Sequence, residues 1–193
     1  MSRGRYTVPK DGGGFPRKHR FRVDADLIAP VALHSSRVEA FTEFVSSYWR
    51  PEGDILLLSP CSNVKPYPLS PLNRKIESGI RKIGAWKRIE WVFISDLLGP
   101  VPYEYTWVHP ACCYDANPST IPFWWLNSLR EILVRWWRRV KGYFSHVITH
   151  LPASYTKIVD FIYADNVPVT SLSYDIFYGQ RHVIREVAKL LGQ

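Results

Sequence analysis

The residues best suited to chemistry lie together in the stretch PCSNVKPYPLSPLN, directly after a short apolar run. Cys61 carries a thiol, Lys65 an ammonium and Tyr67 a phenol, while Ser62 and Ser70 add hydroxyl groups. A thiolate is a strong nucleophile, and a nearby cation favours its formation. The composition therefore indicates a nucleophile with binding groups around it, although a lone cysteine at a strand end is also often simply a buried residue.

A second set of polar candidates follows the apolar run RIEWVFIS. Asp96 ends that run, and the long aromatic loop behind it holds Tyr103, Glu104 and Asp115. A carboxylate facing a cleft can serve as a general base, so Asp96 and Glu104 are the candidates for moving protons. Tyr103 and Asp115 are candidates for binding a substrate, and Asp115 also suits an ordinary turn in the sequence YDANP.

The elements that must position these residues alternate between strands and helices. Strands are expected at DILLLSP, RIEWVFISD, FSHVITHLP and VPVTSLSYD, and helices between or around them, most clearly at PFWWLNSLREILVRWWRRVKGY. This order predicts an α/β fold, a three-layer α/β/α sandwich with a mainly parallel four-stranded sheet. Ligands in such sheets bind beyond the carboxyl ends of the strands, and the segments 59–73 and 95–115 hold nearly all of the unusual residues there.

Charge and composition bound the partners. The 193 residues carry a formal net charge of +8, which favours an anionic partner such as nucleic acid. We expect a basic arm over residues 1–34, with Arg17, Lys18 and Arg20 as RNA contacts, and a single α/β domain over residues 35–193. No run of apolar residues is long enough for a membrane span, and the basic start lacks the apolar segment of a secretory signal.

Cysteine and histidine usage predicts neither a disulfide framework nor a metal site. Two of the three cysteines are adjacent, Cys112 and Cys113, and the odd count fits the reducing cytoplasm, where we expect the protein. The histidines show no zinc-site spacing; His109 and His150 are expected to make only local hydrogen bonds.

A further basic group lies on the longest expected helix, where Arg135, Arg138 and Arg139 follow an i, i+3, i+4 pattern. Such a trio is either a solvated helix face or, beside exposed tryptophans, a surface for RNA backbone contact and stacking.

The first stretch resembles the PCSxxKPYxxSxxH signature of the archaeosine synthase core domain, in the family derived from archaeal tRNA-guanine transglycosylases. The matching positions are Pro60, Cys61, Ser62, Lys65, Pro66, Tyr67 and Ser70. The following strand and loop are similar too, at Asp96, Gly99, Pro102, Glu104, Tyr114 and Asp115. The last position of the signature differs: the family has a histidine where this chain has Asn73, and an asparagine cannot shuttle a proton near neutral pH.

The resemblance implies a function in tRNA modification. Members of that family act on tRNA carrying 7-cyano-7-deazaguanine and add an amine, lysine in the better-described members, across the nitrile. It implies Cys61, Lys65, Asp96 and Glu104 as catalytic residues, and as substrate-binding residues Ser62, Tyr67, Ser70, Asn73, Tyr103 and Asp115. It also implies tRNA and a free amine as partners, with a radical-SAM protein or a separate RNA-binding subunit as further partners, and no metal or other cofactor in this domain.

Two alternatives remain from the sequence. The first is a non-catalytic module or subunit that binds tRNA or another nucleic acid, for which Asn73 would mark lost activity. The second rests on a strand followed by a loop with Pro-Tyr, which resembles the uracil-DNA glycosylase superfamily. We take a uracil-DNA glycosylase-like fold from this comparison, and a nucleic-acid glycosylase is the less favoured function, because Lys65 stands where the water-activating aspartate would be.

Overall fold

The sheet has five strands in the order β3-β2-β1-β4-β5. A computed structural model describes residues 20–116 and 121–193. The strands are β1 (Ile55–Pro60), β2 (Ile89–Ser95), β3 (Gly99–Pro102), β4 (His146–Thr149) and β5 (Val169–Ser171). All neighbouring strands pair in parallel except β2 and β3, which form an antiparallel pair. The predicted mainly parallel α/β sheet is therefore confirmed.

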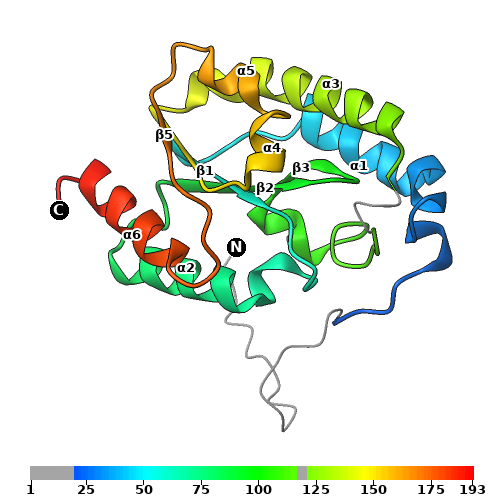
Figure 1. Cartoon of the computed structure of the whole chain (residues 1–193), viewed down its shortest axis with the longest axis horizontal. Coiled ribbons are helices and arrows are strands. Elements are labelled where there is room, and N and C mark those ends of the chain that lie inside the picture. The colour runs from blue at the N-terminus through cyan, green and yellow to red at the C-terminus, as the bar shows by residue number, and fades with distance from the viewer. Residues whose placement is uncertain (1–19, 117–120) are drawn as a thin grey trace, which may run out of the picture.

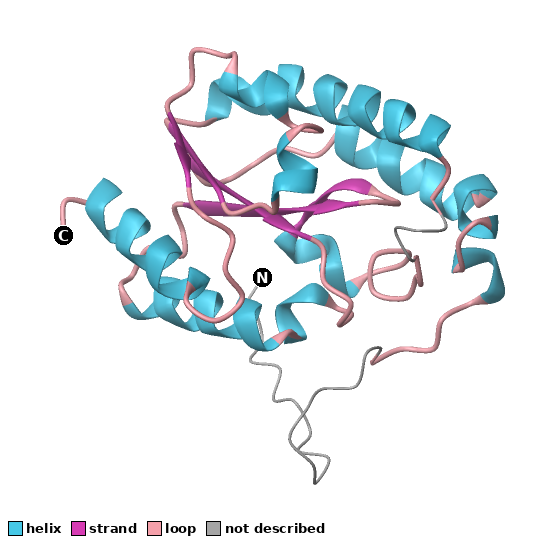
Figure 2. Cartoon of the chain, viewed as in Figure 1, coloured by secondary structure: helices cyan, strands magenta, loops and turns pink. Residues whose placement is uncertain are grey.

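Helices cover both faces of the sheet (Figure 1), as the alternating pattern predicts. On one side lie α2 (Pro71–Lys82) and α6 (Gly179–Leu190), which contact each other. On the other lie α1 (Ser36–Ser47) and α3 (Phe123–Val140), together with the short helices α4 (Ala153–Thr156) and α5 (Asp160–Tyr163). Figure 2 shows how the strands run between these two layers. Short 3-10 helices occur at Ala25–Leu27, Val31–His34, Tyr67–Leu69, Tyr103–Trp107 and Lys141–Tyr143.

The central strands are buried on both faces. In β2 every residue is buried, and β1 is buried as far as Ser59. Strands covered on both sides read as near-continuous apolar runs, which is why ILLL and WVFI are recognisable in the sequence. Each of these strands therefore delivers the polar segment that follows it to one edge of a rigid core.

The strand count differs from the four that the sequence predicts. β3 lies inside the segment expected to be a loop, and it contains Pro100 and Pro102. Proline cannot donate to a strand ladder, so it argues against a strand except at a sheet edge, which is where β3 lies. The helix expected between the third and fourth predicted strands also differs, because this segment forms the two short helices α4 and α5.

Residues 20–34 pack against the domain rather than away from it. Leu27 and Ala32 are completely buried in the core, and the backbone of Ala29 donates to the carbonyl of Asp115. The predicted boundary of the basic arm at residue 34 remains a prediction, and Arg17 and Lys18 lie outside the described residues. Within the described residues, no helix has the length and apolar character needed to cross a lipid bilayer.

Candidate functional site

A cavity of about 570 Å³ opens at the carboxyl edge of the parallel strands. Residues 59–63, 65 and 70–73 at and after the end of β1, Asp96 after β2, and Tyr114 and Ala116 of the next loop line one part of it. His150 and Tyr155 after β4, and Tyr174, Ile176 and Phe177 after β5, line the rest. All four segments that follow the parallel strands thus contribute, whereas the sequence pointed mainly to the first two.

Three side chains in the cavity form a connected group: Cys61, Tyr155 and Asp96. The Cys61 sulfur lies 3.5 Å from the Tyr155 hydroxyl and 4.0 Å from Asp96 Oδ2. Tyr155 also hydrogen-bonds to the Asp96 carboxylate. A thiol, a phenol and a carboxylate are therefore within proton-transfer range of one another.

Burial sets the protonation states of this group. Desolvation raises the pKa of the Cys61 thiol, and the charge of Asp96 raises that pKa further, while Tyr155 and Lys65 lower it by less. Desolvation likewise raises the pKa of Asp96, against the lowering effects of Tyr155 and Lys65. Burial also raises the pKa of Tyr155, which stays a phenol. The resting cysteine is consequently a thiol with a carboxylate as its nearest base, and Lys65 alone does not convert it to a thiolate.

Lys65 is only 3% exposed although its side chain ends in an amino group. Its Nζ donates to the backbone carbonyl of Ser62 at 3.3 Å and lies 4.2 Å from the ring centroid of Tyr114. A buried ammonium over an aromatic face is stabilised by the cation–π interaction. Lys65 is thus held in one position at the wall of the cavity rather than solvated as a surface lysine.

Tyr67 supports the loop from below the cavity. It is fully buried, its hydroxyl shares a hydrogen bond with Tyr114, and its ring packs 5.1 Å from Phe93. Tyr114 also hydrogen-bonds to Ser95 at the end of β2. These contacts connect β2, the signature loop (residues 60–73) and the loop that contains Tyr114. The Tyr67 ring therefore belongs to the packing that supports the loop, and Tyr67 is not among the described residues that line the cavity.

Asn73 and Ser70 form the start of α2. The Ser70 hydroxyl caps the helix by accepting from the Asn73 backbone N–H, and Pro71 occupies the first turn. The Asn73 side chain is buried and donates from Nδ2 to the Tyr67 carbonyl at 2.9 Å. The asparagine therefore fixes the loop geometry, which is a role that needs a donor and no proton transfer.

His150 and Tyr155 belong to the cavity although they are absent from our predicted site residues. His150 directly follows β4 and Tyr155 lies in α4, just beyond it. The rule that ligands bind beyond strand ends already pointed to this segment. The two residues were not selected because the sequence THLPASY contains no recognisable motif.

Besides Tyr67, three predicted residues lie away from the cavity lining. Glu104 is exposed and accepts a hydrogen bond from the Trp49 indole at 2.6 Å. Tyr103 packs between Trp86 and Trp91, with ring centroids 4.8 and 5.9 Å away. Asp115 bonds through its backbone to residues 27 and 29. None of the three is among the described residues that line the cavity, whereas Ser62 and Asp96 are.

The basic residues of α3 have different environments. Arg139 donates to the backbone carbonyls of Val45, Ser46 and Trp49, so it joins α3 to the end of α1. Arg135 pairs with Glu43 at 3.0 Å, while Arg138 is exposed.

The two tryptophans inside the arginine trio are buried and offer no exposed surface for stacking. Trp136 and Trp137 are at most 2% exposed. Their positions belong to the apolar stripe of α3, which faces the core. Arg20, in contrast, is exposed, lies 5.8 Å from the Trp107 ring, and its backbone donates to the Lys65 carbonyl. It therefore sits beside the signature loop.

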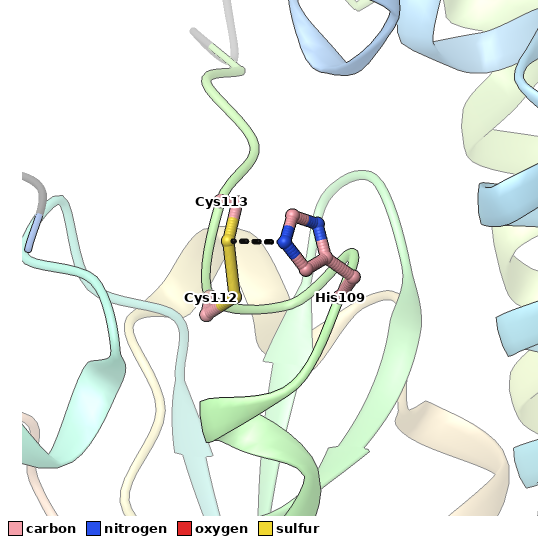
Figure 3. A group of neighbouring side chains, drawn as sticks. All are labelled: His109, Cys112 and Cys113. Carbon is pink, nitrogen blue, oxygen red and sulfur yellow. Dashed lines mark hydrogen bonds between the residues drawn. A yellow bond between two sulfur atoms is a disulfide. The ribbon is translucent and has the colours of Figure 1, made fainter. Parts of the chain in front are cut away.

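A separate cluster contains His109, Cys112 and Cys113 (Figure 3). Its potential ligand atoms all lie within 4.8 Å of one another, and Cys113 Sγ is 3.5 Å from His109 Nε2. The two sulfurs are joined in a disulfide, which differs from the expectation of reduced cysteines. Thiolates, not disulfide sulfurs, bind metals, so this cluster offers a soft-metal ligand set only when reduced.

The chain is similar in sequence to proteins named archaeosine synthase. Archaeosine synthase subunit alpha of Methanosarcina acetivorans is 27% identical over 146 residues, and archaeosine synthase of Haloferax volcanii is 29% identical over 143 residues. These matches cover 70% and 71% of this chain but only 22% and 23% of the relatives. Archaeosine synthase subunit alpha of Thermoplasma acidophilum is 37% identical over 70 residues, which cover 36% of this chain and 13% of the relative.

Among solved structures, AF0587, a protein of unknown function, matches with a TM-score of 0.54 and 22% identity. The match covers 76% of this chain and 49% of AF0587. It supports the α/β fold alone, and the uracil-DNA glycosylase-like assignment stays a prediction.

A sequence family described as a domain of unknown function, DUF5591, matches residues 38–176, which include β1 to β5 and the whole lining of the cavity except Phe177. The resemblance to archaeosine synthases seen in the signature loop is confirmed by these matches, and the chain belongs to the DUF5591 family.

Proposed function

We propose that this chain is a domain of the archaeosine biosynthesis machinery that holds the 7-cyano-7-deazaguanine of a tRNA and adds an amine, lysine, to its nitrile. The relatives named archaeosine synthase and the signature loop support the substrate class. The observation that carries the chemistry is the connected group of Cys61, Tyr155 and Asp96 in one cavity.

The covalent route uses the thiol as nucleophile. Cys61 Sγ bonds to the nitrile carbon, Asp96 accepts the thiol proton, and a proton reaches the nitrile nitrogen, which gives a thioimide. The amine then attacks the same carbon and the C–S bond breaks. The amine nitrogen loses one proton, the thiol is restored, and the product is an amidine.

A protonated thiol needs a proton acceptor before it can attack a nitrile. Asp96 supplies that acceptor, and Tyr155 supplies a hydrogen-bond donor beside it. The raised pKa of Asp96 keeps its proton affinity closer to that of the thiol, so transfer between them is less uphill than to an ordinary aspartate. The Tyr155 phenol stays protonated and donates to the sulfur or the carboxylate as charge moves.

A direct route needs only the carboxylate: Asp96 deprotonates the incoming amine, which attacks the nitrile while Cys61 shapes the wall. The variant Cys61→Ala separates the two routes. Full activity of this variant would leave the direct route, and loss of activity with retained tRNA binding supports the thioimide.

The whole function is proposed to need further protein. The chain spans under a quarter of the length of the first two relatives, so conversion of the amidine, for which the resemblance implies a radical-SAM partner, and much of the tRNA contact are assigned to other polypeptides or domains. The same observation favours the second candidate, a tRNA-binding module without catalysis of its own.

The decisive experiment incubates the protein with lysine and tRNA carrying the cyano base, and then measures nucleoside masses. The proposal expects a mass gain of one lysine on the cyano nucleoside. No gain, with tRNA binding intact, would refute catalysis by this chain and leave the binding module.

The proposed RNA contacts are Arg17 and Lys18 of the basic arm, Arg20 beside the signature loop, and Arg138 on α3. Removing residues 1–22 should weaken tRNA binding and flatten its dependence on salt, and Arg138→Ala should reduce the salt slope by about one. Arg139→Ala is the matched comparison, because its guanidinium binds backbone carbonyls and its loss should lower stability instead. Unchanged affinity and salt slope in the truncation would refute the role of the arm.

A further inference from the structure

His150 is the least explained polar side chain of the cavity. It directly follows β4, it is 0% exposed, and it lines the same cavity as Cys61 and Asp96. Histidine is seldom fully buried without partners for both ring nitrogens, since an unpaired polar atom in the interior costs about 1–3 kcal/mol.

One edge of the imidazole is fixed by the protein. Nε2 accepts the backbone N–H of Asp175 at 3.4 Å, and Tyr174 packs against the ring with centroids 4.9 Å apart. The start of α6 is a glycine, Gly179, and a Cβ there would lie 2.4 Å from Nε2. The absence of a side chain at this position leaves the space that the ring occupies.

The other nitrogen, Nδ1, is without a partner in the part of the chain that the structure describes. Because Nε2 accepts, the proton of the neutral ring lies on Nδ1, and Nδ1 is buried with no hydrogen-bond partner among the described residues. Burial and the charge of His182 lower the pKa of His150 to about 4, against the effect of Asp175, so the ring is neutral near pH 7. A residue that lines the cavity of the Cys61 thiol therefore carries a buried N–H donor without a described partner.

We propose that the Nδ1–H of His150 donates a hydrogen bond to the base bound in the cavity, at the nitrogen where negative charge develops as the nitrile is attacked. This inference deepens the proposed function and rests on it. No bond to His150 is made or broken in the step: the imidazole stays neutral, and the proton delivered to the nitrile nitrogen is the one released by the thiol or the amine.

Two properties suit the ring to this role. A neutral imidazole is a hydrogen-bond donor that does not lose its proton near neutral pH, and enzymes use such a ring to polarise a substrate group. A preorganised donor aimed at developing charge contributes about 10²–10³-fold to the rate. His150 also supplies the cavity with an imidazole although position 73 is an asparagine.

The first measurement needs no turnover. Protein labelled with ¹⁵N-histidine is observed by long-range ¹H–¹⁵N spectra, and the His150→Asn spectrum identifies the His150 signals among the six histidines. We expect the Nδ1–H form in the free protein and a shift of Nδ1 on addition of free 7-cyano-7-deazaguanine. The Nε2–H form, absence of probe binding, or no Nδ1 shift at saturating probe would overturn the inference.

The second measurement uses two matched variants. An asparagine amide nitrogen lies close to the position of Nδ1, and a glutamine amide nitrogen close to that of Nε2. We expect His150→Asn to keep activity within about tenfold, and His150→Gln to lose about 10²–10³-fold in kcat with unchanged tRNA affinity. Equal activity of both variants would overturn the role of Nδ1.

The two proposals fail in different ways. A wild-type protein that shifts Nδ1 on binding the probe but forms no lysine adduct refutes amine addition and supports the His150 contact. A wild-type protein that forms the adduct while Nδ1 stays unchanged supports the function and overturns the His150 contact.

Discussion

The hydrogen bond from Asn73 to the Tyr67 carbonyl allows a test in which only one atom of the loop changes. In Asn73→Asp the donor nitrogen becomes an oxygen, which at neutral pH places a carboxylate against a carbonyl that Asn73 Nδ2 contacts at 2.9 Å. A protonated carboxyl can still donate to that carbonyl. We therefore expect the stability of this variant to depend on pH.

The magnitude follows from two opposing contributions. Burying a charge without a paired partner costs about 3 kcal/mol or more. The residue stands at the start of α2, where the helix dipole returns about 0.3–1 kcal/mol to an anion. The carbonyl keeps its bond from the Ser70 N–H, so it is not left without a donor. The net loss near pH 7 is about 2 kcal/mol, or about 4–8 °C in Tm for a chain of this size.

The sign of the pH dependence is fixed by the folded-state pKa. Desolvation and the facing carbonyl oxygen raise the pKa of the new carboxyl above its unfolded value of about 3.9. Its contribution is then favourable below about pH 3.9 and is lost as the pH rises through the folded-state pKa. The deficit relative to wild type should be small near pH 4 and largest at pH 7 and above.

Thermal unfolding of variant and wild type at matched pH values measures this deficit. The control is Asn127→Asp, at an exposed position on α3, which should change Tm by about 1 °C or less at every pH. A deficit in Asn73→Asp that is no larger than in the control, or that does not grow with pH, would refute the structural role of Asn73.

Two further predictions concern the cavity. Alkylation of Cys61 should require a higher pH than alkylation of the same cysteine in the denatured chain, because burial raises the pKa of the thiol. The variant Asp96→Asn should lower the pH at which alkylation occurs, because the charge of Asp96 raises the same pKa. An alkylation midpoint equal to that of the denatured chain would contradict the raised pKa. The variant Gly179→Ala should lower the free energy of unfolding by about 1–3 kcal/mol, since its Cβ would lie 2.4 Å from the His150 ring. The control Gly142→Ala, with no described atom within 4 Å of the new Cβ, should be nearly neutral in thermal unfolding. Equal effects of the two variants would argue against the close packing at Gly179.

Local patterns predicted most of the fold because burial leaves a signal in the order of residues. The apolar runs of β1 and β2 and the stripe of α3 are readable for this reason. β3 was not, because Gly99–Pro102 is a short edge segment with two prolines, and its pairing with β2 depends on tertiary position rather than on propensity.

The site residues likewise fall into those that a local pattern marks and those that only the tertiary fold brings to the cavity. Cys61, Lys65 and Asp96 were recognised because they belong to a signature or end a clear strand. Tyr155 and His150 reach the cavity only because β4 lies beside β1 in the sheet, and the order of strands cannot be read from a single segment. Glu104 shows the opposite case. It follows Asp96 closely in the sequence, but its position in the 3-10 helix after β3 brings its carboxylate to the Trp49 indole.

The charges of the cavity also say what kind of ligand it suits. Lys65 favours the charged form of Asp96, burial keeps the Cys61 thiol protonated, and the His150 ring is neutral near pH 7, so the described wall pairs its one lysine with a carboxyl group. A site for a phosphate needs uncompensated positive charge, and this cavity does not supply it. An uncharged, polarisable base fits better, and the phosphates of a tRNA would then be met outside the cavity by residues such as Arg20, which is exposed beside the Lys65 backbone. Separation of base binding from phosphate binding predicts that salt weakens tRNA affinity without weakening the affinity for the free base.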